Sequence, residues 1–307
     1  MMALPGQRAL LPGARWHFQH GPIDIIIGAT GDRVALEAAH EQAWQRFQSI
    51  LSELVAELPA LRCRVQGACP VVGVTARRMW SACQPYQSSF ITPMASVAGA
   101  VAQELLSAYQ VAGIQRAWVN NGGDIALHLA PGHSLRVGLY ANLERLDVEQ
   151  LENGISLDGR IDIRSTSPVR GIATSGWRGR SFSLGIADSV TVLARTAAEA
   201  DAAATVIANA VNINDACIIR RPANDIKDNS DLGDLLVTVH VPRLKADQVD
   251  FALASGLTRA LELRSRGLIQ SAFLVCQNRV MTTERIAAQI SKIESDKLPI
   301  AALMDAA

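Results

Sequence analysis

The sequence predicts a single-core globular protein of the α/β type, and three features of the chain support this prediction. Hydrophobic residues make up 49% of the 307 residues and charged residues 19%, a balance typical of a folded domain and not of a disordered chain. Segments with the pattern of a strand alternate along the chain with segments that repeat with the period of a helix. Aromatic residues are only 5% of the chain, so small aliphatic side chains must build most of the core.

The first half of the chain contains one strand region and two helices. Residues 16–29 have the composition of a strand, and the helix expected over residues 33–57 has Asp32 as its N-cap. Residues 61–90 contain three cysteines and two prolines, and we expect a loop-rich connector there. A second helix is expected over residues 93–111, where the first half is almost entirely small residues.

The second half alternates short strands with longer helices. The expected strands are 116–120, 124–129, 135–140, 188–194, 235–241 and 271–275, and the expected helices are 197–211 and 246–266. Thr196, with Glu199 three residues later, has the spacing of a capping box for the first of these helices. We expect one domain over residues 1–282, followed by a polar C-terminal helix or tail over residues 283–307.

Composition and charge exclude several classes of protein. Lysine plus arginine equals aspartate plus glutamate at 29 each, so the basic excess of a nucleic-acid-binding protein is absent. The chain contains no apolar run of eighteen residues, and its first residues lack the pattern of a signal peptide, so we expect no membrane span and a cytoplasmic location. Five scattered cysteines without a C-x-x-C pair favour reduced thiols over disulfides or a zinc site.

A polar stripe on the helix over 197–211 is the strongest candidate for a metal site. Asp201, Thr205 and Asn209 are spaced four residues apart and therefore lie on one helical face, among alanines. A carboxylate buried in such a close-packed helix needs a partner, and carboxylate and hydroxyl oxygens suit Mg²⁺. The alternative is a stripe that simply faces water.

Two glycine-containing segments are candidates for ligand binding. Asn120, Asn121, Gly122, Gly123 and Asp124 follow a strand, and the two glycines allow a close approach of the backbone to an anion. The alternative for this segment is an ordinary β-hairpin turn, because Asn-Gly is a strong turn signal.

The second segment runs from Gly171 to Ser181, with Thr174, Ser175 and Gly176 followed by Trp177, Arg178 and Arg180. Its hydroxyls, glycines and two arginines suit a phosphate or a carboxylate. The alternative is a surface loop whose arginines are solvated. No histidine falls in these glycine-rich segments, so we assign no catalytic histidine.

The expected start of the helix at Pro93 is a further candidate for an anion site. Free backbone N–H groups at a helix N-terminus favour anions, so Met94 and Ser96 are candidate ligand contacts. The alternative is tight helix packing, which Gly99 and the neighbouring alanines would serve equally well. The small-residue face of this helix is also a candidate interface for a homodimer.

Four segments, taken in this order, resemble the ApbE superfamily, the flavin transferases that attach FMN to target proteins. They are TPMASVAGAVAQE (92–104), NNGGDI (120–125), GIATSG with SFSLGIADSVTVLA (171–194) and EADAAATVIANAV (199–211). The resemblance covers residues 88–211 well, and it is closest to a cytoplasmic, ApbE-like branch of the superfamily.

The resemblance implies an α+β protein with a compact two-lobed fold, in which mixed sheets are packed by small-residue helices. It implies that Asp201 and Thr205 bind Mg²⁺ together with a backbone carbonyl from residues 95–98. It also implies that FAD or FMN lies along two segments. Their residues are Asn121, Gly122, Gly123, Asp124, Thr174, Ser175 and Gly176.

One segment departs from the pattern of the transferases. Where they carry a His-x-x-Asp-Pro stretch, this chain has Ser181–Asp188, so Asp188 is the remaining candidate acid there. Three functions therefore stay open. The first is Mg²⁺-dependent transfer of FMN from FAD. The second is a changed enzyme that acts on a small carboxylate, such as one containing a ring, with Arg178 and Arg180 as anion clamps. The third is a non-catalytic flavin carrier or assembly factor.

Overall fold

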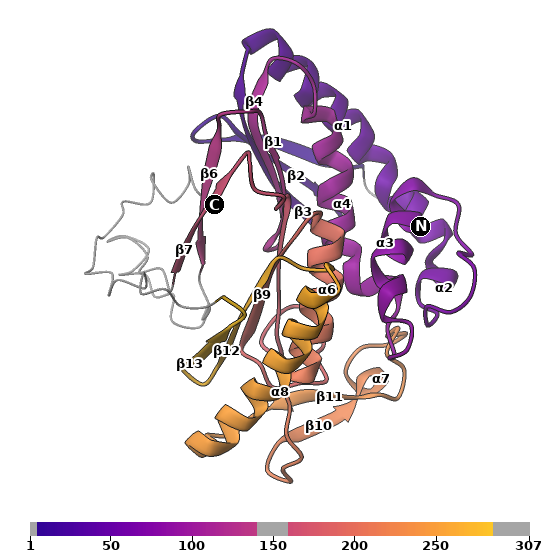
Figure 1. Ribbon diagram of the computed structural model, residues 1–307. Helices are drawn as coiled ribbons and strands as arrows, with labels where there is room; N and C mark the ends of the chain where they lie inside the picture. Colours follow the sequence, from indigo (N-terminus) through magenta and orange to yellow (C-terminus); the bar gives the residue numbers. More distant parts are fainter. Residues whose placement is uncertain (1–4, 140–158, 285–307) are drawn as a thin grey trace.

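The computed structural model describes residues 5–139 and 159–284, and a nine-stranded antiparallel sheet runs through them (Figure 1). The strands lie in the order β1-β2-β3-β4-β5-β8-β9-β12-β13. Their bounds are Gln7–Leu11 (β1), Arg15–His20 (β2), Ile23–Gly31 (β3), Ile114–Asn121 (β4), Asp124–Leu129 (β5), Gly171–Ser175 (β8), Ser189–Ala194 (β9), Ser271–Cys276 (β12) and Arg279–Thr282 (β13). Most neighbours in the sheet are consecutive in the chain, and the long connections from β3 to β4 and from β9 to β12 carry the helices.

Helices cover one face of this sheet (Figure 1). Their bounds are Arg33–Ala56 (α1), Leu58–Leu61 (α2), Val74–Cys83 (α3), Val97–Leu106 (α4), Ala197–Ala210 (α6) and Ala246–Ser265 (α8), with short 3-10 turns at Gln84–Tyr86 (η1), Pro93–Ser96 (η2) and Ser107–Tyr109 (η3). Where α4 crosses α6, a Cβ on Gly99 would lie 2.3 Å from the carbonyl oxygen of Ala197. Glycine therefore allows the two backbones to touch, and this contact positions the site described below.

The opposite face of the sheet carries a second, smaller hydrophobic cluster. Because side chains alternate along a strand, Val119 of β4 faces the helices while its neighbour Trp118 faces away from them. Trp118 and Leu127 belong to a cluster that also includes residues of the hairpin formed by β6 (Ser134–Leu139) and β7 (Gly159–Arg164). The core therefore has two layers, one on each side of the sheet.

A short excursion between α6 and α8 forms a separate two-stranded sheet. It consists of β10 (Ile219–Pro222), α7 (Ala223–Ile226) and β11 (Leu236–His240). The backbone N–H of Thr238 donates to the carbonyl of Ser183 at 2.8 Å, and the hydroxyl of Thr92 donates to Asp231 at 2.5 Å. These two bonds tie the excursion to the rest of the fold.

The prediction of an α+β fold is confirmed, with one correction to the expected mixed sheets. Every strand pair in the described part of the chain is antiparallel, including the pairs joined by long connections, so the sheets are not mixed. The expected C-terminal helix or tail falls almost entirely outside the described residues. Among the helices that the structure describes, none combines the length and the apolar character needed to cross a bilayer.

Several element boundaries also differ from the sequence expectation. The connector expected over 61–90 contains the helix α3, whose buried Thr75, Ala76 and Met79 recur at helical spacing between Pro70 and Pro85. The strand expected over 16–29 is a hairpin of two strands that turns at Gly21, where φ is +57°. The segment expected as a loop from Gly171 begins with strand β8.

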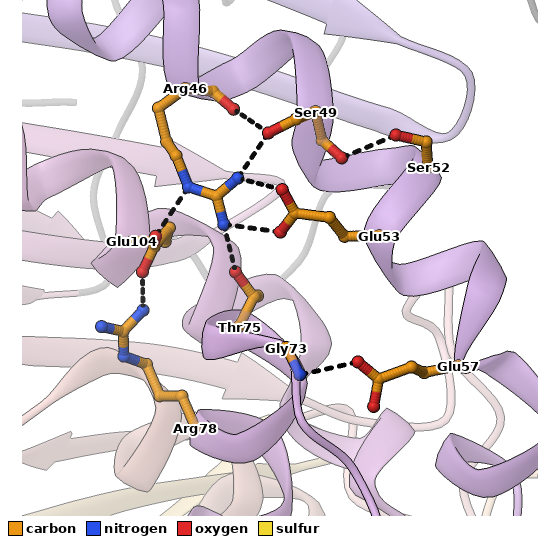
Figure 2. A network of polar contacts seen from close by, with 9 residues as sticks. All are labelled: Arg46, Ser49, Ser52, Glu53, Glu57, Gly73, Thr75, Arg78 and Glu104. Atoms are coloured by element: carbon orange, nitrogen blue, oxygen red, sulfur yellow. Dashed lines mark hydrogen bonds and ion pairs between the residues drawn. The ribbon is translucent and has the colours of Figure 1, made fainter.

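A network of charged side chains joins α1, α3 and α4 on the side of the helices (Figure 2). Arg46 on α1 donates from Nε to Glu104 at 2.7 Å, and its two terminal nitrogens bind both oxygens of Glu53 at 2.7 and 2.8 Å. Arg78 on α3 binds the other oxygen of Glu104. Burial alone would raise the pKa of Glu104, but the bonds from Arg46 and Arg78 outweigh it and hold that pKa below its ordinary value.

Candidate functional site

The polar stripe of α6 meets the start of α4 at the crossing that Gly99 makes possible. Asp201 accepts a hydrogen bond from the backbone N–H of Gly99 at 2.9 Å, and the N–H of Ala98 also stabilises its carboxylate. Both N–H groups lie in the first turn of α4, where helix amides lack partners within the helix. Asp201 thus caps a helix other than its own, and its carboxyl is withdrawn from water although the residue keeps some exposed surface.

Thr205 lies one helical turn after Asp201 on the same face, as the spacing predicted. Its hydroxyl is 3.4 Å from the carbonyl oxygen of Ala95 in η2. The resemblance placed a carbonyl ligand somewhere between residues 95 and 98, and the structure singles out Ala95 as the carbonyl beside Thr205. Asp201, Thr205 and Ala95 therefore contribute a carboxylate, a hydroxyl and a carbonyl oxygen where α6 meets η2 and the start of α4.

The third residue of the stripe has a different task. Asn209 accepts hydrogen bonds through its side-chain oxygen from the backbone N–H of Leu184 at 2.9 Å and from the hydroxyl of Ser183 at 3.2 Å. It holds the loop before β9 against α6. The stripe therefore divides into two residues near the start of α4 and one that supports a neighbouring loop.

The turn between β4 and β5 brings a second carboxylate to this place. Gly122 and Gly123 form a two-residue hairpin loop with φ of +66° and +108°, and the N–H of Gly123 is bound by the side chain of Asn120 at 2.8 Å. The structural alternative for this segment, a hairpin turn, is thus what the chain forms. The side chain of Asn121, however, donates to the carbonyl of Ala98 at 3.1 Å, so the turn is joined directly to α4.

Asp124, the first residue after the turn, is buried beside Asp201. Its carboxylate accepts the backbone N–H of Thr174 at 3.1 Å, which connects the hairpin to the end of β8. Burial, and then the neighbouring charge of Asp201, raise the pKa of Asp124 well above its ordinary value, while Thr174 and Arg180 oppose this rise. Burial likewise raises the pKa of Asp201 to about 7, although the N–H groups of Gly99 and Ala98 favour its ionised form.

The segment Thr174–Gly176 ends strand β8 next to these carboxylates. Besides the backbone bond to Asp124, Thr174 exchanges a side-chain hydrogen bond of 2.9 Å with Thr191 of β9. Ser175 is half-buried at the last position of the strand, and Gly176 lies against the backbone of Asp188. The structure therefore brings the predicted Asn-Gly-Gly-Asp and Thr-Ser-Gly segments together around one pair of aspartates.

The two arginines of the following loop occupy different places. The guanidinium of Arg180 lies on Gly122, since a Cβ built on that glycine would be 1.7 Å from its terminal nitrogen. Arg178 instead donates from Nε to Asp188 at 3.0 Å and stacks at 5.0 Å on the ring of Trp177.

Asp188 is held by three donors. In addition to Arg178, it accepts the indole N–H of Trp177 at 3.3 Å and the backbone N–H of Gln277 at 2.5 Å. Gln277 stands in the turn between β12 and β13, so Asp188 fastens the loop to that hairpin. This arrangement is typical of a structural carboxylate.

Of the two candidate contacts near Pro93, Ser96 faces the interior of the fold. Its hydroxyl is within 3.1 Å of the carbonyl of Met79 and 3.2 Å of that of Pro93, and it accepts a weak bond from the thiol of Cys83. Met94 is half-buried and packs against the main core. These contacts attach η2 to α3 and thereby fix the carbonyl of Ala95.

The donors present define which kind of metal ion the site can hold. Within residues 5–139 and 159–284, no three side chains of His, Cys, Asp or Glu gather as a metal-binding group. An ion at Asp201 would therefore be held by a mixed set of carboxylate, hydroxyl and carbonyl oxygens, completed by water or ligand. Hard oxygen donors with few carboxylates suit Mg²⁺, which usually retains several waters.

Sequence comparison identifies relatives that cover part of this chain. A UPF0280 protein of Methanospirillum hungatei is 39% identical over 132 residues, which are 43% of this chain and 50% of that protein. A UPF0280 protein of Methanothrix thermoacetophila is 38% identical over 148 residues, 48% of this chain and 54% of that protein. The chain thus spans about half the length of these curated relatives. A UPF0280 protein of Methanopyrus kandleri is 33% identical over 197 residues, 62% of this chain and 72% of that protein.

The chain was also compared with solved structures and with family models. An ApbE protein of Thermotoga maritima aligns over 91% of this chain and 96% of its own, with 13% identity and a TM-score of 0.41. The flavinyl transferase ApbE of Pseudomonas stutzeri aligns over 92% and 97%, with 12% identity and a TM-score of 0.44. The family model described as AbpE bacteria matches residues 8–284, nearly the whole described part of the chain. The chain therefore belongs to the AbpE bacteria family.

Proposed function

We propose that the chain binds a flavin nucleotide together with Mg²⁺ and transfers FMN from FAD. The observation that carries this proposal is the meeting of the Asp201 carboxylate, the Thr205 hydroxyl and the Ala95 carbonyl at the start of α4. These are the positions at which the resemblance to the ApbE superfamily implies the metal. The sequence pattern and the local geometry thus support the same site independently.

The electrostatics of the site favour a cation. Two buried carboxyl groups, Asp124 and Asp201, lie close enough to raise each other's energy when ionised, and burial raises the pKa of both. Buried charges of like sign are stable only with a partner of opposite charge. A divalent ion at Asp201 would provide that partner and would let both groups ionise near neutral pH.

The residues around the metal position have distinct tasks in this proposal. Asp201, Thr205 and the carbonyl of Ala95 would hold the ion, which neutralises a diphosphate and acts on it as a Lewis acid. The N–H groups of Ala98 and Gly99 orient Asp201, and Asn121 fixes the hairpin turn to the carbonyl of Ala98. The turn at Gly123 would let the ligand approach the backbone closely, since Gly123 has no side chain and a Cβ there would meet no atom within 4 Å.

In such a transfer, an acceptor hydroxyl oxygen forms a bond to the phosphorus of the FMN half of FAD. The bond from that phosphorus to the bridging oxygen breaks, AMP leaves, and the hydroxyl proton passes to the medium. The segment Ser181–Asp188 lacks the histidine of the transferases, which favours a second candidate function, a changed enzyme acting on a small carboxylate. The first function predicts binding of FAD and the second predicts binding of a small carboxylate, so titration with these ligands separates them.

The experiment is calorimetric titration of the protein with FAD, FMN and ADP, each with and without Mg²⁺, followed by measurement of AMP release from FAD. We expect Mg²⁺-dependent binding of FAD that is abolished in Asp201→Asn, and Mg²⁺ binding weakened about tenfold in Thr205→Val, the loss of ~1.4 kcal/mol. Glu199→Gln is the matched control, because it removes the same charge from another face of the same helix.

Each other outcome has a definite meaning. Binding of FAD without release of AMP, even with an acceptor hydroxyl supplied, would indicate a flavin carrier or assembly factor. If wild type binds none of the three nucleotides but does bind small carboxylates, the result would favour the changed enzyme. Equal Mg²⁺ dependence in wild type and Asp201→Asn would show that the metal site has been misplaced.

A further inference from the structure

The guanidinium of Arg180 occupies the space that a side chain on Gly122 would fill. A Cβ built on Gly122 would lie 1.7 Å from a terminal nitrogen of Arg180, 2.8 Å from its Cζ and 3.4 Å from its Nε. The next residue, Gly123, has an equally unusual backbone with φ of +108°, but a Cβ there would meet no atom within 4 Å. Of the two glycines, only Gly122 therefore leaves space that the guanidinium of Arg180 occupies.

Arg180 is also a positively charged group close enough to influence Asp124 of the carboxylate pair. Its charge lowers the pKa of Asp124, against the effects of burial and of Asp201. In the described part of the chain, no hydrogen bond or ion pair fixes its guanidinium, and the residue is exposed. The guanidinium therefore lies beside Gly122 and acts on Asp124, in a position from which its N–H groups can meet a ligand.

Arg178 differs from Arg180 in each of these respects. Its Nε is bound to Asp188, its guanidinium stacks on Trp177, and it makes further contacts. The sequence offered the two arginines as a pair of anion clamps. The structure separates them into one that fastens the loop and one that lies at the carboxylates.

We propose that Arg180, seated on Gly122, is the residue that selects ligands carrying a diphosphate. This inference rests on the proposed function and names the group that the site recognises. A metal ion at Asp201 and the guanidinium of Arg180 would then be two positive charges near Asp124. A diphosphate, with anionic oxygens on two linked groups, can bind both at once, whereas neutral riboflavin can bind neither. The planar guanidinium suits phosphate oxygens because it donates two parallel hydrogen bonds.

The proposal is tested by measuring the affinity of Arg180→Gln, Gly122→Ala, Gly67→Ala and the double variant Gly122→Ala/Arg180→Gln. The ligands are FAD and ADP with Mg²⁺, and riboflavin. We expect Arg180→Gln to weaken FAD and ADP binding about ten- to a hundredfold, the usual effect of losing a hydrogen bond between charged groups, and to leave riboflavin binding unchanged.

The glycine variants test whether the position of Arg180 depends on the absence of a side chain at Gly122. In Gly122→Ala the new methyl group must displace the guanidinium, so we expect a loss of FAD affinity similar to that of Arg180→Gln. Gly67→Ala is the matched control, because Gly67 has the same φ of +66° as Gly122, lies outside the proposed site, and a Cβ there would meet no atom within 4 Å, so its affinity should remain close to wild type. In the double variant the two losses should not add, because both act through the same side chain.

Several results would overturn the inference. Wild-type affinity for FAD and ADP in Arg180→Gln would do so while leaving the proposed function intact, as would equal losses in Gly122→Ala and Gly67→Ala. A parallel loss of riboflavin binding would assign Arg180 to the flavin ring instead of the diphosphate. Absence of Mg²⁺-dependent FAD and ADP binding in wild type would remove the proposed function, and this inference with it. Thermal unfolding of each variant confirms that the protein being titrated is folded.

Discussion

The molecule places buried carboxylates in two regions and treats them in opposite ways. In the network of Figure 2, Glu104 lies between Arg46 and Arg78, and its pKa stays below its ordinary value despite burial. At the candidate site, burial raises the pKa of Asp201 to about 7 and that of Asp124 well above its ordinary value. Both regions involve helix α4, and the carboxyl groups of Asp124 and Asp201 are more deeply buried than that of Glu104.

The groups bonded to each carboxylate also differ. Glu104 has two guanidinium partners within the fold, whereas the hydrogen bonds to Asp201 and Asp124 come from neutral backbone N–H groups. The network is thus electrically complete as it stands. Among the residues that the structure describes, no guanidinium is bonded to the aspartate pair, and this difference is the physical reason for our proposal that one region binds a cation while the other stabilises the fold.

The largest expected effect comes from removing the charge at the centre of the network. Glu104→Gln leaves Arg46 and Arg78 facing a neutral amide, and we expect the free energy of unfolding to fall by about 2–4 kcal/mol. Glu53→Gln is the matched control, since the side chain of Glu53 is 39% exposed against 10% for Glu104, and it should lose no more than ~1 kcal/mol. Urea unfolding of both variants measures this. Equal losses would mean that the network is not organised around Glu104.

The next effect has the opposite sign and concerns Asp201 in the metal-free protein. Asp201→Asn removes a buried charge that lacks a cation, so we expect the variant to be more stable than wild type at pH 8 by roughly 2–4 kcal/mol. The sign follows from the pKa, which folding raises from its ordinary value of 3.8 to about 7. Stability from protonated Asp201 is fully present below about pH 4 and is lost as the pH rises to about 7.

Unfolding measured in chelator at pH 5 and pH 8 tests this prediction. The advantage of Asp201→Asn over wild type should be larger at pH 8 than at pH 5. The stability contributed by the Glu104 network should be nearly equal at these two pH values, because a lowered pKa contributes stability that is lost only as the pH falls below the ordinary value of 4.5. A variant that is less stable than wild type at pH 8 would mean that Asp201 already has a partner within the fold.

Local signals in the sequence were sufficient for most of the regular elements. The helix after Asp32 begins where its N-cap predicted, with Asp32 accepting the N–H groups of Val34 and Ala35. The helix after Thr196 does so as well, although the structure forms only the half of the capping box that Thr196 provides. The helix α3 was missed because three cysteines and two flanking prolines hid a short apolar period. Strand β8 was missed because it is short and its glycine and alanine have weak strand propensity, whereas in the fold pairing on both sides stabilises it.

The site shows a different limit of sequence reasoning. The spacing of Asp201 and Thr205 places them on one helical face, so their proximity followed from the sequence alone. The link between Asp124 and Thr174 spans 50 residues, and the link between Asp201 and Gly99 spans 102, so no local pattern contains them. The division of labour between Arg178 and Arg180 also depends on a contact, that of Arg180 with a turn about 58 residues earlier.

The smallest expected effect concerns Asp188, and it decides whether this residue is a structural carboxylate like Glu104 or part of the candidate site. The sequence offered Asp188 as a candidate acid, whereas the structure gives it three donors, one of them the guanidinium of Arg178. If it belongs with Glu104 as a structural carboxylate, Asp188→Asn should lower the free energy of unfolding by about 1 kcal/mol and leave Mg²⁺-dependent FAD binding and AMP release close to wild type. Loss of AMP release in a variant that unfolds like wild type would instead make it a catalytic acid. In that case a carboxylate that is fully satisfied in the metal-free fold would still take part in chemistry, and the completeness of its partners would no longer separate binding from stability.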